Sequence, residues 1–406
     1  MRLLLLLAVR NLSRNLRRTG ISMAAVAFGV LAIIVSGGFV ESLLIKLRED
    51  TIYSHFGHIR IEDARSAARG LSDPYAYLLS QGAASLKAIA GLPGVRTVMP
   101  RLAFSGLVSV GGTTLSFTGD AIDPAQEQLF NRGLAIIQGE SLRANDVDAV
   151  VLGEGLAVNL GAKLGEKVVL LVNTPGGGIN AREFIVRGTF ASISKLYDDT
   201  ALRLPVGAAE ALLRVRGVQQ WNVLLESTEA TRAMLQKIRA LLPDGRFALT
   251  SWDQNADFYH KTSTLFARQF GFARAIIVVI IMLSILNTMT MNVIERTWEV
   301  GVMLAVGDSR RQVLALFACE GALLGLLGSL LGAVGGVLIG WALNTLGLPM
   351  PAPPGMNHGF DAGVVVSPAL ALTAVAIGFA AAALASLLPA VRASRLVVVN
   401  ALRQTR

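Results

Sequence analysis

Four long apolar segments constrain the fold of this chain more than any other feature. They lie at 21–44, at about 272–293, within 313–346 and within 364–391. Each contains the roughly 18 to 20 apolar residues that a helix needs to cross the hydrocarbon core of a bilayer. With 53% hydrophobic and only 16% charged residues, the chain is far more apolar than a soluble globular protein. We therefore predict an α-helical membrane protein with four transmembrane helices.

The first apolar segment could be read as a cleaved signal peptide because basic residues precede it. Its apolar core is too long for that role, and no A-x-A-like cleavage site follows it. We expect it to remain as a membrane span. The preceding residues 1–20 place leucines among regularly spaced arginines, which fits either an amphipathic helix on the membrane surface or a simple basic flank.

The net charge of +9 lies beside the apolar segments. Residues 1–20 contain five Arg and residues 391–406 contain four, with no acidic residue in either range. The long segment 45–270 is nearly balanced, with 24 basic and 22 acidic residues. Excess Arg beside spans indicates the cytoplasmic side of a membrane and not a nucleic-acid surface. We expect both termini and the loop 294–312 in the cytoplasm, residues 45–270 in the periplasm or outside the cell, and contact with membrane lipids but not nucleic acid.

The segment between the first two spans predicts a large α+β domain inserted between helices 1 and 2. The runs HIRIEDA (58–64) and FIVRGTF (184–190) alternate like strands, whereas 85–92 and 228–242 have helical spacing. We expect α+β parts at about 50–100 and 203–262 and a β-rich insertion at about 101–202. The single cysteine, Cys319, lies in the third span, so no intrachain disulfide can form.

Motifs for enzymatic chemistry are absent from the 406 residues. The run NTPGGG (173–178) suits a hairpin turn, and no GxxxxGK[ST] phosphate loop occurs. The four histidines, at 55, 58, 260 and 358, show no metal-ligand spacing, and no Ser/His/Asp set can be argued. We expect no catalytic residue, no metal, no cofactor bound by this chain and no enzymatic activity of its own.

The third span is rich in glycines spaced four apart, which lets helix backbones approach closely. These candidate packing residues are Gly321, Gly325, Gly328, Gly332, Gly336 and Gly340. The same span holds Glu320, and an ionisable group there is expected to face protein or water. It could be a functional carboxylate or a structural hydrogen-bonding group near the cytoplasmic interface.

The stretch ERTWEVGVMLAVGDSRRQV (295–313) brings charges between two spans that contain almost none. Read as a helix, it has an apolar strip of Val300, Met303, Leu304 and Gly307. An exposed apolar strip rimmed by charge suits a partner protein. The alternative is an interfacial helix resting on lipid headgroups.

The stretch 286–313 resembles the signature of MacB/FtsX-type ABC permeases, the family of macrolide exporters and lipoprotein-releasing permeases. The matching positions are Asn287, Thr288, Met289, Glu295, Arg296, Glu299, Gly301, Ala305, Gly307, Ser309, Arg310 and Arg311. The glycines after Glu320, the C-terminal LLPAVRASRLVVVNALR and the run 150–171 are also similar to the family. Leu304 departs from it where Arg or Lys is common, and Val398 or Val399 replaces the usual proline.

The resemblance implies that 294–312 is a coupling helix seated on a separate cytoplasmic ABC ATPase, which would bind ATP and Mg. The implied ATPase contacts are Glu295, Arg296, Glu299, Gly301, Met303, Leu304, Ala305, Gly307, Arg310 and Arg311. It also implies a second permease copy or a homologue, a bacterial inner membrane and, as a further candidate partner, a periplasmic carrier or adaptor protein. Hydrolysis would drive motion outside the membrane, which is called mechanotransmission.

The expected function is extraction or export of a hydrophobic cargo, such as a lipoprotein, a lipid or an amphiphilic compound. One alternative is an FtsX-like regulator of a periplasmic cell-wall hydrolase, but those have smaller exported domains than 45–270. A membrane sensor is another, and the short tail 392–406 argues against it. The Pro-rich loop 348–359, within the expected periplasmic loop 347–363, has no assigned role beyond a hypothesis of cargo contact.

Overall fold

The computed structural model describes residues 10–11, 16–69, 74–130, 134–192, 194–243, 245–350 and 360–398. The expected amphipathic helix at 1–20, most of the Pro-rich loop and the tail beyond 398 therefore lie largely outside the described residues. The chain divides into two compact units. The helical unit draws on Met1–Leu44, Thr262–Pro349 and Asp361–Arg406, and the mixed unit on Ile45–Lys261 and Met350–Phe360.

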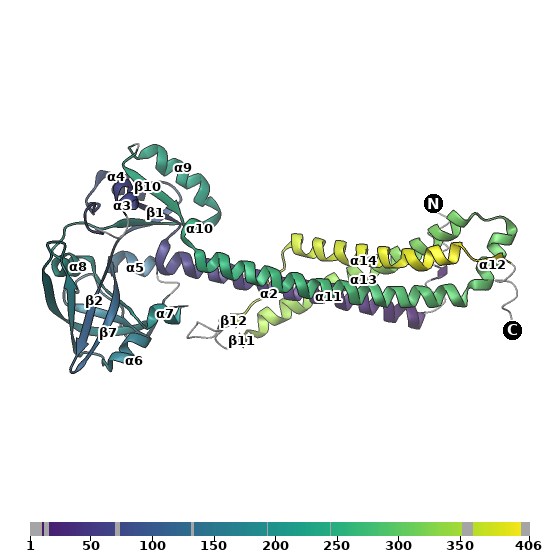
Figure 1. The fold of residues 1–406 in the computed structure, drawn as a ribbon, viewed down its shortest axis with the longest axis horizontal. Coiled ribbons are helices and arrows are strands. Elements are labelled where there is room, and N and C mark those ends of the chain that lie inside the picture. Colours follow the sequence, from purple (N-terminus) through teal and green to yellow (C-terminus); the bar gives the residue numbers. More distant parts are fainter. Residues whose placement is uncertain are drawn as a thin grey trace. The chain divides into compact units, whose positions relative to one another are not determined.

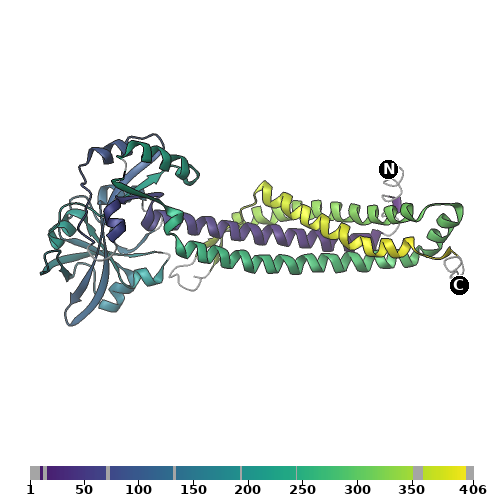
Figure 2. The same cartoon turned by 45° about the horizontal axis from the view of Figure 1, so that its top comes forward.

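Four long helices make up most of the helical unit, and they lie side by side (Figures 1 and 2). They are α2 (Leu16–Thr51), α11 (Asp257–Glu295), α13 (Arg310–Leu346) and α14 (Pro368–Ser394). All four are long and apolar enough to cross a membrane. The short helix α12 (Thr297–Val306) joins α11 to α13 at one end of the bundle (Figure 1). Two short strands, β11 (Leu348–Met350) and β12 (Phe360–Ala362), pair with each other.

Local sequence signals set where two of these helices begin. Ser309 and Gln312 form a capping box, so α13 starts at Arg310, three residues before the expected 313. Ser367 caps α14, and Pro368 occupies its first turn, so this helix starts four residues after the expected 364. The bundle core contains Val26, Ile34, Ile281, Ile285 and Leu324, none of them exposed.

The mixed unit is built on a ten-stranded sheet. Its strands are β1 (Ile59–Asp63), β2 (Val95–Val110), β3 (Thr113–Ile122), β4 (Ala135–Gly139), β5 (Ala149–Gly153), β6 (Lys167–Asn173), β7 (Ile179–Ala191), β8 (Ala201–Pro205), β9 (Gln220–Leu225) and β10 (Phe247–Ser251). Its helices are η1 (Ile52–Phe56), α3 (Ala64–Arg69), α4 (Ala84–Ala90), α5 (Pro124–Phe130), α6 (Glu154–Leu160), α7 (Lys195–Asp198), α8 (Val206–Leu213), η3 (Thr228–Ala230), α9 (Thr231–Leu241) and α10 (Trp252–Asn255). The predicted strands at 58–64 and 184–190 and the predicted helices at 85–92 and 228–242 are confirmed as β1, β7, α4 and α9.

The sheet has two parts, and the long strand β2 belongs to both. Its first half pairs with β9, in the order β10-β1-β9-β2. Its second half pairs with β3 and β6, and the ladders continue through β8, β5 and β7 back to β6, which closes a barrel. The boundary expected near residue 101 thus falls inside β2, because one long strand serves both parts.

Candidate functional site

The corner from α11 through α12 to α13 contains most of the candidate site residues. Arg296 interrupts the helix after α11 with φ −106° and ψ 16°, and α12 follows at once. Gly307 ends α12 in the left-handed region at φ 109°, which favours glycine, and Ser309 then starts α13. The charged and glycine-containing stretch of the sequence therefore forms a tight turn–helix–turn (Figure 1).

Arg296 holds the corner together through two carboxylates. Its Nη1 donates to Glu320 Oε1 of α13 at 2.9 Å, and its Nε donates to Glu299 Oε2 of α12 at 2.9 Å. Glu320 is 1% exposed and also accepts from Asn11 Nδ2 at 2.6 Å. Charge-assisted hydrogen bonds of this kind are among the stronger ones in proteins. The hydrogen bonds of Glu320 connect α13 to the corner, as expected of a structural group.

A second set of contacts ties α2 to α11 next to the corner. Arg18 and Glu295 form an ion pair at 2.7 Å, and both side chains remain partly exposed. About two turns earlier on α11, the hydroxyls of Ser22 and Thr288 hydrogen-bond at 2.6 Å in the buried interior. The end of α11 is thus linked to α2 on one side and to α13 on the other.

Part of the apolar strip predicted to be exposed on α12 faces the protein instead. Val300 is 2% exposed and packs in a cluster with Val293, Val313, Phe317 and two alanines of α14. Leu304 packs against the same cluster, so an apolar residue suits this position. The prediction that Val300 is exposed is wrong, because packing against α13 and α14 removes its apolar side chain from water.

The exposed surface of α12 is formed mainly by residues other than Val300 and Leu304. Trp298 is 52% exposed and Val306 is 84% exposed, and Ala305 and Gly307 lie in the same exposed region of the chain. Arg310 and Arg311, at the start of α13, are also exposed, whereas Met303 is half-buried and Gly301 is buried. Sequence reasoning missed Trp298 and Val306. No local sequence signal distinguishes them, because α12 is apolar on nearly all sides.

The six glycines of α13 are all buried, and they face three different neighbours. A Cβ on Gly321 or Gly325 would meet Ser386 or Ala382 of α14 at 2.2 or 2.5 Å. On Gly328, Gly332 and Gly336 it would meet residues of α2, with the backbone oxygen of Ala27 only 2.4 Å from the Gly332 position. Gly340 faces Val364 and Val366, which precede α14. These contacts pack α13 within its own chain.

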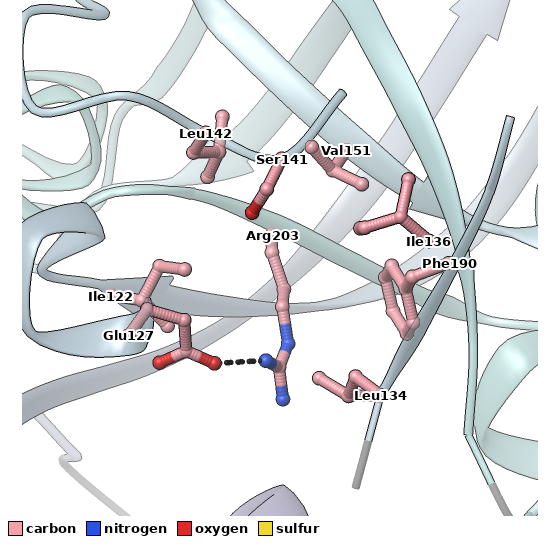
Figure 3. Close-up of a pocket in the computed structure, with 9 residues that line it drawn as sticks. All are labelled: Ile122, Glu127, Leu134, Ile136, Ser141, Leu142, Val151, Phe190 and Arg203. Carbon is pink, nitrogen blue, oxygen red and sulfur yellow. Dashed lines mark hydrogen bonds and ion pairs between the residues drawn. The ribbon is translucent and has the colours of Figure 1, made fainter. Parts of the chain in front are cut away.

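A buried ionic network lies between helix α5 and strands β2, β3 and β8 of the mixed unit. Arg203 Nη1 donates to Glu127 Oε1 at 2.5 Å, and Arg101 Nη2 donates to Glu127 Oε2 at 3.1 Å. Asp120 bonds to Arg101 as well. Figure 3 shows Arg203 and Glu127 beside a cavity walled by Ile122, Leu134, Phe190 and their neighbours. The cavity measures about 20 Å³, which suits one water molecule and no larger ligand.

A wider cleft of about 500 Å³ opens elsewhere in the mixed unit. It is lined by Arg60, Glu62, Ser66, Pro74, Tyr75, Ala103, Phe104, Ser105, Thr118 and Gln219. Its charged side chains, Arg60 and Glu62, pair with each other at 2.9 Å. Among the residues that the structure describes, no group of three or more His, Cys, Asp or Glu could hold a metal ion. The cleft therefore offers no recognisable catalytic constellation.

His58 is a buried titratable group at the start of β1. Its Nδ1 accepts from the Leu225 backbone N–H at 3.1 Å, and its Nε2 lies 3.0 Å from the Thr228 hydroxyl. Thr228 in turn donates to Glu49 at 3.1 Å. Burial, with a further contribution from the charge of Arg48, lowers the pKa of His58 to about 4. The ring therefore stays neutral near pH 7 and serves as a structural acceptor.

Two protein families match this chain. Residues 19–241 match the family described as MacB-like periplasmic core domain, and residues 271–398 match the FtsX-like permease C-terminal family. The solved periplasmic region of MacB from Actinobacillus actinomycetemcomitans covers 50% of this chain and 92% of its own, at 18% identity and a TM-score of 0.37. That structural similarity is too low to add to the assignment.

Several curated relatives are similar along much of the chain. The lipoprotein-releasing system transmembrane protein LolC of Neisseria meningitidis is 24% identical over 80% of this chain and 77% of its own length. The macrolide export ATP-binding/permease protein MacB of Bartonella henselae is 25% identical over 96% of this chain and 59% of its own. An uncharacterized ABC transporter permease of Methanocaldococcus jannaschii is 26% identical over 64% of this chain, and the match spans 66% of the relative's length.

The family matches and the four apolar helices agree on a multi-pass membrane protein. The periplasmic-core match alone covers more than half of the 406 residues. This chain belongs to the family of ABC transporter permeases that combine a MacB-like periplasmic core domain with an FtsX-like C-terminal region.

Proposed function

We propose that this chain is the membrane subunit of an ABC transporter in which a separate cytoplasmic ATPase drives extraction or export of a hydrophobic cargo. The ATPase would bind ATP and Mg, and this chain would supply the docking surface and the moving parts. The observation that carries the proposal is the α12 corner, which is braced from inside by Arg296 and Glu320 and leaves Trp298 and Val306 open. A rigid apolar patch of this kind can receive a partner without first rearranging.

The docking surface combines the outer face of α12 with the start of α13. Trp298 and Val306 supply the apolar contact, and the exposed Arg310 and Arg311 supply positive charge at its edge. Glu299 lies at the rim, where it is partly exposed and hydrogen-bonded by Arg296. The buried candidates Val300 and Gly301 would act indirectly, by keeping α12 in place.

The contacts around the corner favour transmission of force from α12 into the bundle. A push on α12 would reach α13 through Arg296 and Glu320. It would reach α2 through α11, because Arg18–Glu295 and Ser22–Thr288 join those two helices. Both α2 and α11 continue along the chain into residues of the mixed unit. These continuous helices support the mechanotransmission proposal.

The arginine distribution supports an orientation for the protein. With residues 1–20, 294–312 and 392–406 in the cytoplasm, α12 faces the ATPase, and the mixed unit is a periplasmic domain between the first two spans. The membrane would be the bacterial inner membrane. The domain's place outside the cytoplasm suits a cargo that leaves the outer leaflet.

The relatives' names suggest the class of cargo. LolC is named for lipoprotein release and MacB for macrolide export, and both kinds of molecule are amphiphilic. We infer a lipoprotein, a lipid or an amphiphilic compound as the cargo, and a periplasmic carrier or adaptor protein as its receiver.

Co-purification from native membranes tests the proposed ATPase docking. The full chain carrying Val306→Asp should lose an associated ABC ATPase, and Trp298→Ala should weaken the association. Leu196→Asp is the matched control, because Leu196 is also 84% exposed but belongs to α7 of the mixed unit. An ATPase that stays bound to the Val306→Asp chain would reject this surface, and a native chain that never retains one would reject the proposal.

A further inference from the structure

The cleft of about 500 Å³ in the mixed unit is large enough for a ligand, and most of its lining is polar. Its volume lies within the range of about 300–1,000 Å³ that is typical of ligand-binding sites. Of its ten described lining residues, seven carry polar side chains, and the others are Pro74, Ala103 and Phe104. The two charged side chains, Arg60 and Glu62, have opposite signs and pair with each other. Such a lining does not suit acyl chains, because they would cover polar groups without hydrogen-bonding them.

Strand β2 lines the cleft at the point where its pairing is interrupted. Its ladder with β9 ends at Arg101, and its ladder with β6 begins at Gly106. In the described part of the chain, residues 102–105 between these two ladders pair with β3 alone. A short open backbone edge therefore lies at the cleft, where Ala103 and Ser105 are exposed.

Gln219 shows which backbone groups point to this open edge. Its N–H donates to the Arg101 carbonyl at 3.1 Å, and its side-chain Oε1 accepts from the Ala103 N–H at 3.0 Å. Alternate residues of a strand direct their N–H and C=O groups to the same side. The next groups along the edge are therefore the Ala103 carbonyl and the Ser105 N–H, an acceptor followed by a donor.

Contacts within the mixed unit hold the cleft in shape. Gln219 also donates from Nε2 to the Pro74 carbonyl at 3.2 Å, so one side chain connects β2 to the segment that contains Tyr75. Tyr75 is half-buried, and Phe104 packs edge-on against Phe117 with ring centroids 5.6 Å apart. A preformed cleft loses little conformational entropy when a ligand binds.

We propose that this cleft binds an extended polypeptide segment of the cargo, which adds to β2 as a short strand at Ala103 and Ser105. A polypeptide backbone offers both donors and acceptors, so it can pair with the Ala103 carbonyl and the Ser105 N–H as a strand does. The hydroxyls of Ser66 and Thr118 and the ring of Tyr75 are available to its side chains. This inference rests on the proposed function in naming the segment as cargo, and it selects a protein cargo over a lipid or a small amphiphilic compound.

Peptide binding to the purified full chain in lipid nanodiscs, without ATPase or ATP, tests the cleft. The probe is a fluorescent peptide of sequence Lys-Thr-Val-Ser-Val-Thr-Lys, and its control is the same peptide N-methylated at its three central residues. Binding should saturate, and the methylated peptide should bind roughly tenfold more weakly because it lacks the backbone donors. Absence of binding, or equal binding of the methylated peptide, would overturn strand addition. Displacement of the peptide by lysophosphatidylethanolamine would identify a lipid site instead.

A proline substitution tests the β2 backbone itself. Ser105→Pro removes the N–H that faces the cleft and leaves the ladder with β3 in place, so it should weaken peptide binding roughly tenfold. Ser116→Pro on β3 is the matched control, because Ser116 is also exposed and its N–H also points away from the β2–β3 ladder, but it does not line the cleft. Equal peptide binding by both variants would overturn the site. If Ser105→Pro does not fold, the methylated peptide on the native chain decides the same question.

ATP hydrolysis separates this inference from the proposed function. In a native complex that retains an ATPase, the peptide should change the hydrolysis rate roughly twofold or more, because cargo and ATPase act on one coupled system. A peptide that binds without changing hydrolysis would overturn the assignment of the segment as cargo. A chain that binds the peptide but never retains an ATPase would reject the proposed function and the cargo assignment, while the peptide site would stand.

Discussion

Each unit of this protein contains an ionic network of arginines and carboxylates. The two networks differ in how far their charged side chains are exposed to solvent. In the mixed unit, Arg101 and Arg203 share Glu127 and Asp120, and three of these four side chains are 4% exposed or less. In the helical unit, Arg296 and Glu299 remain 20% and 33% exposed, and only Glu320 is fully buried. The first network is therefore almost entirely buried, whereas the second includes partly exposed side chains at the protein surface.

The difference indicates what each network can do. Two arginines and two carboxylates on β2, β3, α5 and β8 pair with one another, and the cavity beside them is large enough for one water molecule. Such a network stabilises a barrel and receives no partner. The corner network instead fixes α12 while Trp298 and Val306 stay accessible beside it. A partner can therefore act on α12 without entering the protein interior.

Removing Arg203 should have the largest effect on stability. Arg203→Met would leave Glu127 buried with one cation fewer, and loss of one member of a buried ionic network costs about 3–5 kcal/mol. Limited proteolysis and hydrogen exchange of the full chain should show early opening of β3 and β8. Arg182→Met on β7 is the control, because its partner Asp148 is 53% exposed. Equal protection of Arg203→Met and Arg182→Met would show that the buried network does not stabilise the barrel.

His58 should make the mixed unit sensitive to acid. Its pKa is about 4 in the folded chain and 6.5 without burial, so the unfolded chain binds the extra proton between those values. The free energy of unfolding should fall by about 3 kcal/mol as the pH drops from 6.5 to 4. Denaturation of the full chain at several pH values measures this. His58→Gln should be less stable at pH 7 but should lose this part of the pH dependence, and an unaltered slope would contradict the assignment.

Removing Arg296 should loosen the corner. Arg296→Gln removes the charge-assisted hydrogen bonds to Glu299 and Glu320, at a cost of about 2–3 kcal/mol, and hydrogen exchange should rise mainly in α12. Glu320→Gln keeps the size of the side chain and retains an oxygen that can accept from Arg296, so it should have a smaller effect. If Arg296→Gln leaves hydrogen exchange in α12 unchanged, the hydrogen bonds of Arg296 are not needed to hold the proposed docking surface in place.

Much of the helical unit could be predicted from the sequence because its signals are local. Long apolar runs specify the spans, and the Ser309/Gln312 spacing specifies the start of α13. The orientation of α12 could not be predicted in the same way. Its sequence TWEVGVMLAV is apolar on nearly all sides, so periodicity does not show which face packs against α13 and α14.

The fold of the mixed unit depends on contacts between residues far apart in the sequence, which local sequence patterns do not reveal. Glu127 and Arg203 are 76 residues apart, and Arg101 and Glu127 are 26 apart, so neither pair has a spacing that would reveal it. The closure of the barrel depends on β2 pairing with β6, across three other elements of the sheet. Alternation predicts individual strands, but which strands pair is decided by packing of the whole domain.

Substitution of a glycine in α13 should have the smallest effect on stability, and a nearby glycine provides a closely matched control. Gly332→Ala would place a Cβ 2.4 Å from the Ala27 backbone oxygen and 2.8 Å from Val30, so α2 and α13 must separate slightly. Such overpacking should cost about 1–2 kcal/mol and lower the melting temperature of the full chain by a few degrees. Gly335→Ala, three residues away, would meet only the tip of the Leu31 side chain at 3.2 Å, which can move aside. Because both substitutions add one methyl group and the same helix propensity, a melting temperature lowered equally by both would show that the close approach of α13 to α2 is not what Gly332 provides.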